Sequence, residues 1–410
     1  MTISSRSGTA VAGRLGRDGA FWAAASVLAL ALWSSGAPSV LYPIYAERWD
    51  LTPVVMTTVF ATYQLALMVV LPLFGNLSDL VGRRRVMTLG VGLMAVSALL
   101  FAVAPDVSYL YAGRVLQGAG AGLSMGAATA SLVENSTTRG PRAASTTATV
   151  ATSAGLTLAL LVSGVLAEYL PMPLLWSYVV LLVLATASVV ALALTPDDRP
   201  PVRAPWRPRA PFVPAGIRTG FVVATLSVAL AYCVGAIFLS LGAHMIDQLT
   251  RTESTAVVGA LLAASAACIG ITGLFLGRVD ARRLVWAGVG LTLASLVLMA
   301  AASARASLPL FLAWCVVGGV AYAVAFTGGL GLVNGLAPQH HRGAVLSFLY
   351  LVAYALQAVT AIGAGAVATR VSLGVAMEVA AVFLAGLCAV VVVLLLSGSC
   401  RASPVEAVTA

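Results

Sequence analysis

Long stretches without charge dominate this chain, and they limit what it can fold into. Residues 51–74 contain no ionisable group except Tyr63, and residues 86–104 contain none at all. Each stretch has about the 20 residues that a helix needs to cross a hydrocarbon layer of roughly 30 Å. Only 9% of the residues are charged, whereas a soluble domain has about 25%. The sequence therefore predicts an all-α integral membrane protein.

Twelve such stretches can be delimited, in two groups of six. The first group covers residues 20–41, 52–74, 86–104, 109–133, 143–167 and 172–194. The second group covers residues 218–244, 254–276, 284–303, 308–335, 343–368 and 372–396. We predict two six-helix bundles, residues 20–194 and 218–396, with polar tails at 1–19 and 397–410. Residues 195–217 between the bundles hold seven prolines and several charges, a composition that predicts a linker.

The two groups repeat at a nearly constant spacing. The first and seventh stretches start 198 residues apart, the fourth and tenth 199, and the sixth and twelfth 200. Internal repeats of this kind are typical of transporters whose two halves are related by a pseudo-twofold axis. The sequence thus predicts twelve transmembrane helices in two pseudo-symmetric six-helix bundles.

The distribution of arginine indicates how the bundles are oriented. All 23 basic residues are arginine, a composition common in GC-rich bacterial genomes. Eighteen of them fall in the tails, the linker and every second loop, four fall in the other loops, and Arg114 lies inside a span. Because positive residues stay in the cytoplasm, we expect a bacterial cytoplasmic membrane protein with both termini inside. Short arginine-rich loops also argue against a nucleic-acid partner.

The turn between the second and third spans carries a recognisable pattern of glycine and charge. Its residues Gly75, Asp79, Gly82, Arg83 and Arg84 fit the pattern G-x-x-x-D-[RK]-x-G-R-[RK]. This turn resembles the signature loop of the major facilitator superfamily, although leucine occupies position 80, where the family usually has a cation. The resemblance implies that the turn takes part in gating, with its acid meeting the positive N-terminal end of span 11.

The fourth span contains the sequence Arg114-Val-Leu-Gln117-Gly118. It resembles the family's R-x-x-Q-G motif, which implies a role in proton coupling. A guanidinium is costly within a membrane, so we expect Arg114 to face the bundle interior and find partners; the alternative is an arginine that snorkels to the interface. Span 5 departs from the family's drug antiporters, which often carry Gly-Pro where this chain has Ala159-Leu160.

Polar and aromatic side chains at mid-membrane depth are candidates for a substrate site. They are Trp33, Tyr42, Tyr63, Gln64, Tyr232, Phe238, Tyr350, Tyr354 and Gln357. Each could equally serve helix packing, but the two glutamines need partners if they are buried. No Asp or Glu stands at the middle of any span, which favours a neutral or weakly charged substrate over a cation.

The family resemblance implies a secondary active transporter that works by alternating access. We expect a monomer in the lipid bilayer that exports a small, amphipathic organic compound, driven by the proton gradient, without cofactor or metal. Uptake of a metabolite by symport or facilitated diffusion is the alternative. A polytopic membrane enzyme is a remote one: Gly122-Leu-Ser124-Met-Gly126 matches G-x-S-x-G, but a nucleophile elbow requires a strand-to-helix turn, which a mid-helix serine lacks.

The arginine distribution leads to a testable topology. Reporter proteins fused at Arg207 and at Ala410 should report the cytoplasm, and a fusion at Asp106 should report the outside. An external signal from the fusion at Arg207 would contradict the arrangement of two bundles joined by a cytoplasmic linker.

Overall fold

The computed structural model describes residues 15–136, 141–196, 198, 212–250, 254–338 and 341–397, and within these ranges it contains helices and no strand. Twelve of the helices have 20 or more residues: α1 (Arg17–Trp49), α2 (Pro53–Phe74), α4 (Arg83–Ala102), α5 (Val107–Asn135), α6 (Pro141–Tyr169), α7 (Pro173–Ala193), α8 (Arg218–Thr250), α9 (Thr255–Phe275), α10 (Ala281–Arg305), α11 (Leu308–Leu336), α12 (Arg342–Arg370) and α13 (Leu373–Leu396). Short helical turns are α3 (Leu77–Val81), η1 (Ala215–Ile217) and η2 (Leu276–Arg278). Most of the predicted tails and linker lies outside the described residues.

Eleven helices within the described ranges are long and apolar enough to cross a membrane. The twelfth long helix, α5, is less apolar because it carries Arg114, Gln117 and five glycines. The predicted all-helical membrane fold is therefore confirmed, and α5 is the one long helix that does not reach the hydropathy of its neighbours.

The first helix is longer than predicted. The sequence places its end at residue 41, but α1 continues through Pro38 and Pro43 to Trp49. Each proline removes only one backbone donor, and a membrane helix can absorb that loss where neighbours satisfy the freed carbonyl. The helix ends at Trp49, and the left-handed backbone of the next residue, Asp50 (φ 48°), lets the N–H of Leu51 also donate to the carbonyl of Ala46 at 2.9 Å.

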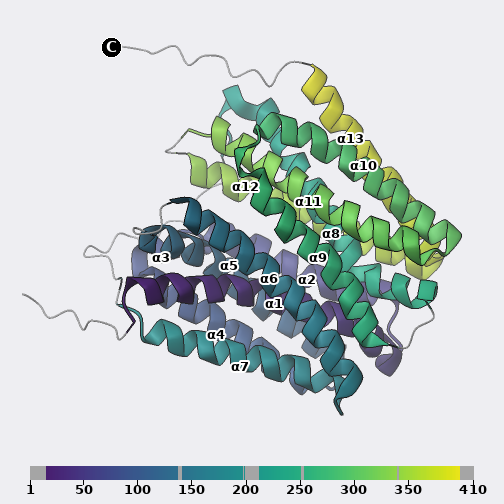
Figure 1. Cartoon of the computed structure of the whole chain (residues 1–410), viewed down its shortest axis with the longest axis horizontal. Coiled ribbons are helices and arrows are strands. Elements are labelled where there is room, and N and C mark those ends of the chain that lie inside the picture. Colours follow the sequence, from purple (N-terminus) through teal and green to yellow (C-terminus); the bar gives the residue numbers. More distant parts are fainter. Residues whose placement is uncertain are drawn as a thin grey trace, which may run out of the picture.

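Figure 1 shows the two halves as separate bundles, with α1–α7 in purple to teal below and α8–α13 in green to yellow above. Helices at the same position in the order of the two halves, such as α5 and α11, contact corresponding neighbours. In the first half α5 packs on α1, α2 and α4, and in the second half α11 packs on α8, α9 and α10. The repeat read from the sequence is thus also a repeat of packing.

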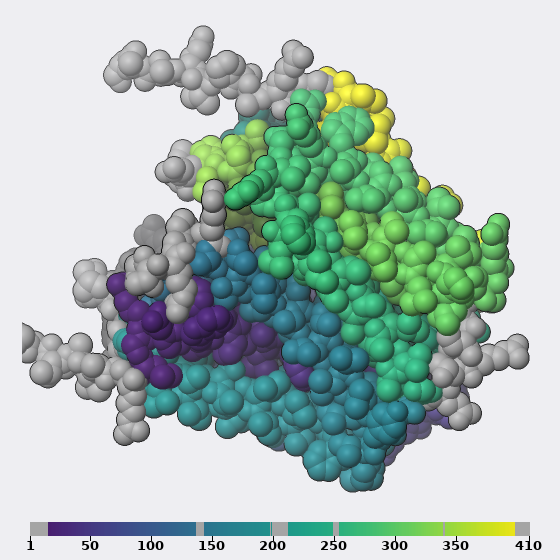
Figure 2. Space-filling model, in the orientation of Figure 1, coloured from purple at the N-terminus to yellow at the C-terminus, as the bar shows by residue number. Residues whose placement is uncertain are grey.

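The halves meet along two seams, in which α6 packs on α9 and α2 packs on α12. Figure 2 shows the first of these, where the blue helices of the first half meet the green α9. The backbones approach closely there: a Cβ on Gly164 would lie 2.6 Å from the carbonyl oxygen of Thr255 and 3.0 Å from the Cα of Gly259. Small residues at helix interfaces allow such approach in membranes.

Two hydrogen bonds cap helix starts across the seams. The N–H of Thr255, at the start of α9, donates to the carboxylate of Glu168 near the end of α6 (2.7 Å). The N–H of Val54, at the start of α2, donates to the hydroxyl of Thr369 near the end of α12 (2.9 Å). The two bonds correspond to each other in the internal repeat, because α6 and α9 occupy the same places in their halves as α12 and α2. Both bonds lie at the end of the bundle that is predicted to face outward. They hold that end of the two halves together.

Removing these caps should loosen the predicted outer end. Leu241 lies beside a hollow of about 280 Å³ where α2, α8, α12 and α13 meet. In a protein with Leu241→Cys as its sole cysteine, Glu168→Ala or Thr369→Ala should speed labelling by an impermeant thiol reagent roughly fivefold, since a helix cap contributes about 1 kcal/mol.

Glu378→Ala is the matched control, because this exposed acid lies on α13 at the same end of the bundle. It should leave the labelling rate unchanged. Equal labelling rates in the parent protein and in both cap variants would show that the caps do not hold the halves together.

Candidate functional site

Arg114 lies at the centre of the first half and is fully buried. Its Nη1 donates to the backbone carbonyl of Ser35 and to Oε1 of Gln117, both at 3.2 Å. Its Nη2 donates to the hydroxyl of Tyr42. The guanidinium carbon also lies 5.5 Å from the centre of the Tyr42 ring and 5.9 Å from that of Tyr63. Arg114 therefore faces the interior and does not snorkel.

The partners of this guanidinium are all neutral. Among the described residues, no carboxylate forms an ion pair with Arg114, and the acids of the chain stand near helix ends. Carbonyl, amide and hydroxyl dipoles and the faces of two rings offset part of the cost of burying the charge. The Nε of Arg114 and the Nε2 of Gln117 are buried without a hydrogen-bond partner.

A close contact between α2 and α5 places Tyr63 over the arginine. Gly118 lies one helical turn after Arg114, and a Cβ there would fall 2.3 Å from the carbonyl oxygen of Tyr63. Only glycine permits this approach, which explains why the glycine of the R-x-x-Q-G pattern follows the arginine by four positions. The three residues predicted for coupling therefore form one structural unit.

A group of five aromatic rings, here called the tyrosine cluster, lies in the second half on α8, α11 and α12. Its members are Tyr232, Tyr322, Phe326, Tyr350 and Tyr354. The rings of Tyr232 and Tyr354 are 4.9 Å apart, and the hydroxyl of Tyr232 donates to that of Tyr354 at 3.5 Å. Sequence reasoning missed Tyr322 and Phe326, although their i, i+4 spacing on one span was a signal for a shared helix face.

Tyr63 and Gln64 are neighbours on α2, and Gln357 lies on α12 about one turn after Tyr354 of the tyrosine cluster. Tyr354 packs against the buried core of the first half, to which Tyr63 belongs, so the tyrosine cluster adjoins the half that holds the arginine. Gln64 on α2 and Gln357 on α12 are buried, each with an Oε1 that has no partner. Since α2 packs on α12, these polar groups belong to a seam between the halves.

Two of the predicted binding residues lie elsewhere. Phe238 packs against Trp314 (5.2 Å between ring centres) and Phe311 (6.4 Å), in an aromatic group separate from the tyrosine cluster. Trp33 is buried in the core of the first half, and its Nε1 has no partner. Whether either one contacts substrate stays a prediction.

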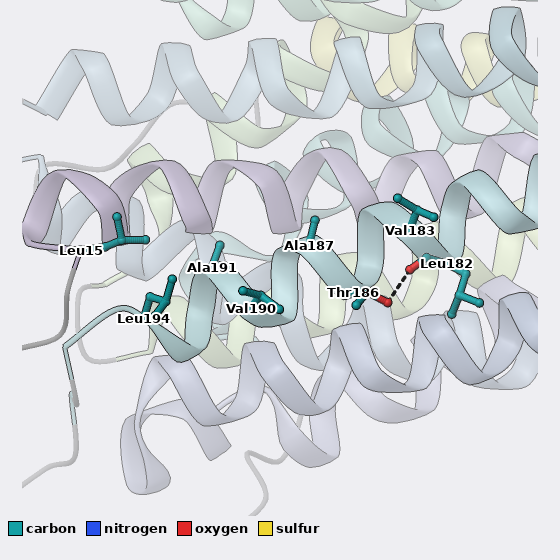
Figure 3. Close-up of a pocket in the computed structure, with 8 residues that line it drawn as sticks. All are labelled: Leu15, Leu182, Val183, Thr186, Ala187, Val190, Ala191 and Leu194. Atoms are coloured by element: carbon teal, nitrogen blue, oxygen red, sulfur yellow. Dashed lines mark hydrogen bonds between the residues drawn. The ribbon is translucent and has the colours of Figure 1, made fainter.

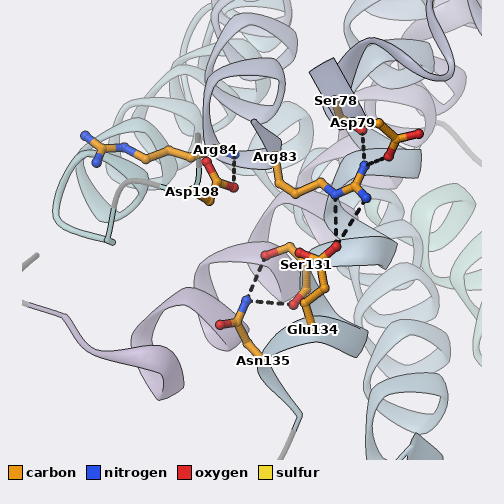
Figure 4. A network of polar contacts seen from close by, with 8 residues as sticks. All are labelled: Ser78, Asp79, Arg83, Arg84, Ser131, Glu134, Asn135 and Asp198. Atoms are coloured by element: carbon orange, nitrogen blue, oxygen red, sulfur yellow. Dashed lines mark hydrogen bonds and ion pairs between the residues drawn. The ribbon is translucent and has the colours of Figure 1, made fainter. Parts of the chain in front are cut away.

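The signature turn is organised by Arg83, as Figure 4 shows. Its guanidinium donates to Ser78 (2.6 Å), pairs with Asp79 four residues earlier, and pairs with Glu134 on α5 at 3.2 Å. The four-residue spacing of Asp79 and Arg83 suits their pairing on a helical turn, whereas Glu134 lies on a different helix and comes to Arg83 only in the folded chain. The contact of Asp79 with the start of span 11 remains a prediction.

Arg84 connects the same turn to the end of the first half. Its guanidinium donates to the carbonyls of Ala193 (3.0 Å), the last residue of α7, and Thr195 (2.8 Å), two residues further on. Its backbone N–H donates to the carboxylate of Asp198 at 2.9 Å (Figure 4). A Cβ on Gly82 would lie 2.7 Å from that carboxylate, and the φ of Gly82 is +98°, so only glycine suits this position.

One hollow lies on α7 at the edge of the first half. It measures about 680 Å³ and is lined by Leu15 and by apolar residues of α7 (Figure 3). The hydroxyl of Thr186 bonds the carbonyl of Leu182 in its own helix, so the hollow offers almost no free polar group and is not the candidate transport site.

No cluster of metal-ligating side chains occurs among the described residues, and four described cysteines are free thiols.

Comparison with known proteins places these features in a family context. Residues 22–249, more than half of the chain, match the model of the Major Facilitator Superfamily. Over 120 residues the chain is 34% identical to a lincomycin resistance protein of Streptomyces lincolnensis, covering 29% of this chain and 24% of that protein. Over 83 residues it is 32% identical to the quinolone resistance protein NorA of Staphylococcus aureus, covering 20% of this chain and 21% of NorA. The chain thus aligns with less than a quarter of the length of either relative.

Solved structures agree with the fold over nearly the whole chain. A bacterial homologue of the human lysosomal transporter Spinster, in an inward-facing and unoccupied conformation, has a TM-score of 0.75, with 95% of this chain and 99% of that chain covered. A variant of the nucleoside transporter NupG has a TM-score of 0.72, with 91% and 98% covered. The sequence identities are 14% and 11%, so these likenesses concern the fold alone.

The contacts of Arg84 lead to a prediction about stability. Arg84→Gln should lower the free energy of unfolding by roughly 1–3 kcal/mol, because hydrogen bonds from a charged donor to two carbonyls are lost. Thermal unfolding of the purified protein measures the change. Arg85→Gln, at the exposed neighbouring position, removes the same charge and should change little. Equal losses in both variants would mean that Arg84 contributes through charge alone.

Proposed function

The chain belongs to the major facilitator superfamily, and on that premise we propose that this transporter exports a small amphipathic organic compound by alternating access. The compound is neutral or weakly charged, and the proton gradient supplies the energy. The relatives named as resistance proteins support export. Uptake remains the alternative, since the fold is also that of a nucleoside transporter.

The observation that carries the proposal is the polar and aromatic centre between the two halves. The buried arginine unit of α5, the unpartnered amide oxygens of Gln64 and Gln357, and the tyrosine cluster lie in largely apolar bundles. Buried polar groups without partners are costly, and a substrate with apolar surface and a few polar atoms would satisfy them. Such a site suits an amphipathic compound.

The proposal assigns Arg114, Gln117 and Gly118 to coupling and the signature turn to gating. Alternating access opens and closes each end of the bundle around a central site. Arg83 joins Asp79 of the turn to Glu134 of α5, and Arg114 lies on the same helix. Movement of α5 would therefore be transmitted between the central site and the turn.

A substrate screen tests this function. The gene is expressed in a bacterial host that lacks its own efflux pumps, and growth tolerance and cell accumulation of a panel of organic compounds are measured. Export predicts raised tolerance and lowered accumulation of at least one compound, and a protonophore should abolish both effects. Raised accumulation would instead establish uptake, and an effect that persists with the protonophore would exclude proton coupling.

A further inference from the structure

The surroundings of Arg114 contain more hydrogen-bond donors than acceptors. Gln117 directs its Oε1 to the guanidinium, so its Nε2 must point elsewhere, and that nitrogen is buried without a partner. The Nε of Arg114 is likewise buried and unpartnered. Both side chains are 0% exposed. Two neighbouring N–H groups, one of them cationic, therefore lack an acceptor.

The same place carries a net positive charge. The hydroxyl of Tyr42, the carbonyl of Ser35 and the amide oxygen of Gln117 supply dipoles to Arg114, but none of them supplies a negative charge. No described carboxylate pairs with Arg114. An ion buried without a counter-ion costs several kcal/mol even after relaxation. What the site lacks is an anion with more than one acceptor oxygen.

The adjoining surface has a different chemistry. The Tyr63 ring lies against the guanidinium, and Tyr354 of the tyrosine cluster packs against the buried core of the first half, to which Tyr63 belongs. The tyrosine cluster consists of rings and hydroxyls and carries no charge. Aromatic surfaces of this kind bind flat ring systems by stacking or edge contacts.

We propose, building on the transport function above, that the substrate is an aromatic carboxylate with a single negative charge. Its carboxylate accepts hydrogen bonds from Arg114 and Gln117, and its ring system packs against the tyrosine cluster. Tyr63, which now covers one face of the guanidinium, is the side chain that the carboxylate displaces. The planar fork of arginine matches the two oxygens of a carboxylate.

Three compounds that differ in charge but share one ring system test the proposal. The protein is purified into lipid nanodiscs, and equilibrium binding of 2-naphthoate, 2-naphthamide and 2-naphthylmethylammonium is measured. The anion should bind about tenfold more tightly than the amide, the factor expected for one charge-assisted hydrogen bond, and the ammonium should bind most weakly. Arg114→Gln should make the anion and the amide bind equally.

Three further variants separate charge recognition from ring recognition. Tyr354→Leu should weaken all three compounds by a similar factor and keep their order, because it alters only the aromatic surface. Arg370→Gln removes an exposed arginine from the last turn of α12 and should leave every affinity unchanged. Arg114→Lys, which keeps the charge without the fork, should keep part of the preference for the anion.

The ranking in the wild-type protein decides the matter even if Arg114→Gln does not fold. Amide or ammonium binding as tight as that of the anion would overturn the proposal, as would no binding of naphthoate at millimolar concentration. A preference for the anion that survives in folded Arg114→Gln would also overturn it. Because these are binding measurements, the substrate screen can still show export of neutral compounds, which would leave the proposed function intact while this inference fails.

Discussion

Helices in a bilayer gain little from pressing apolar side chains together, because lipid tails are equally apolar, so their association depends on close backbone approach. This structure uses that approach at its seams and at its centre. Gly164 and Gly259 let α6 and α9 touch, and Gly118 lets α2 rest on α5. The second contact has a chemical result, because it holds the Tyr63 ring beside Arg114. The polar centre is therefore arranged by the same small residues that hold the bundles together.

The sequence was sufficient for features that depend on one segment at a time. Apolar length predicted the helices, and the cost of a charge in the membrane predicted that Arg114 would turn inward. Pairings between distant segments could not be predicted in this way. Glu134 joins Arg83 across about 50 positions, and Tyr322 joins the tyrosine cluster through the rotation of α11 about its axis. Phe238 shows the same limit, since an aromatic residue at the right depth packed into a different group.

The two halves share a frame but differ in their interiors. Each packing contact and each cross-seam cap of one half has its equivalent in the other. Among the residues that the structure describes, however, the buried charge lies in the first half, while the tyrosine cluster lies in the second. A symmetric frame suits the rocking motion of the proposed alternating access. The asymmetric interior gives the central site two unlike walls.

The position of Arg114 also bears on how the chain enters the membrane during synthesis. An arginine within a span opposes insertion, by up to about 2.5–3.5 kcal/mol at the middle of the helix, and α5, which carries Arg114, is the one long described helix that is not apolar enough to count as a candidate span. The helices that α5 contacts most are α1, α2 and α4, and all three are made before it. Ser35, Tyr42 and Tyr63 are thus already available when α5 leaves the ribosome. The order of the helices along the chain therefore allows α5 to pack against α1, α2 and α4 as it enters the membrane, so that Arg114 need not face lipid.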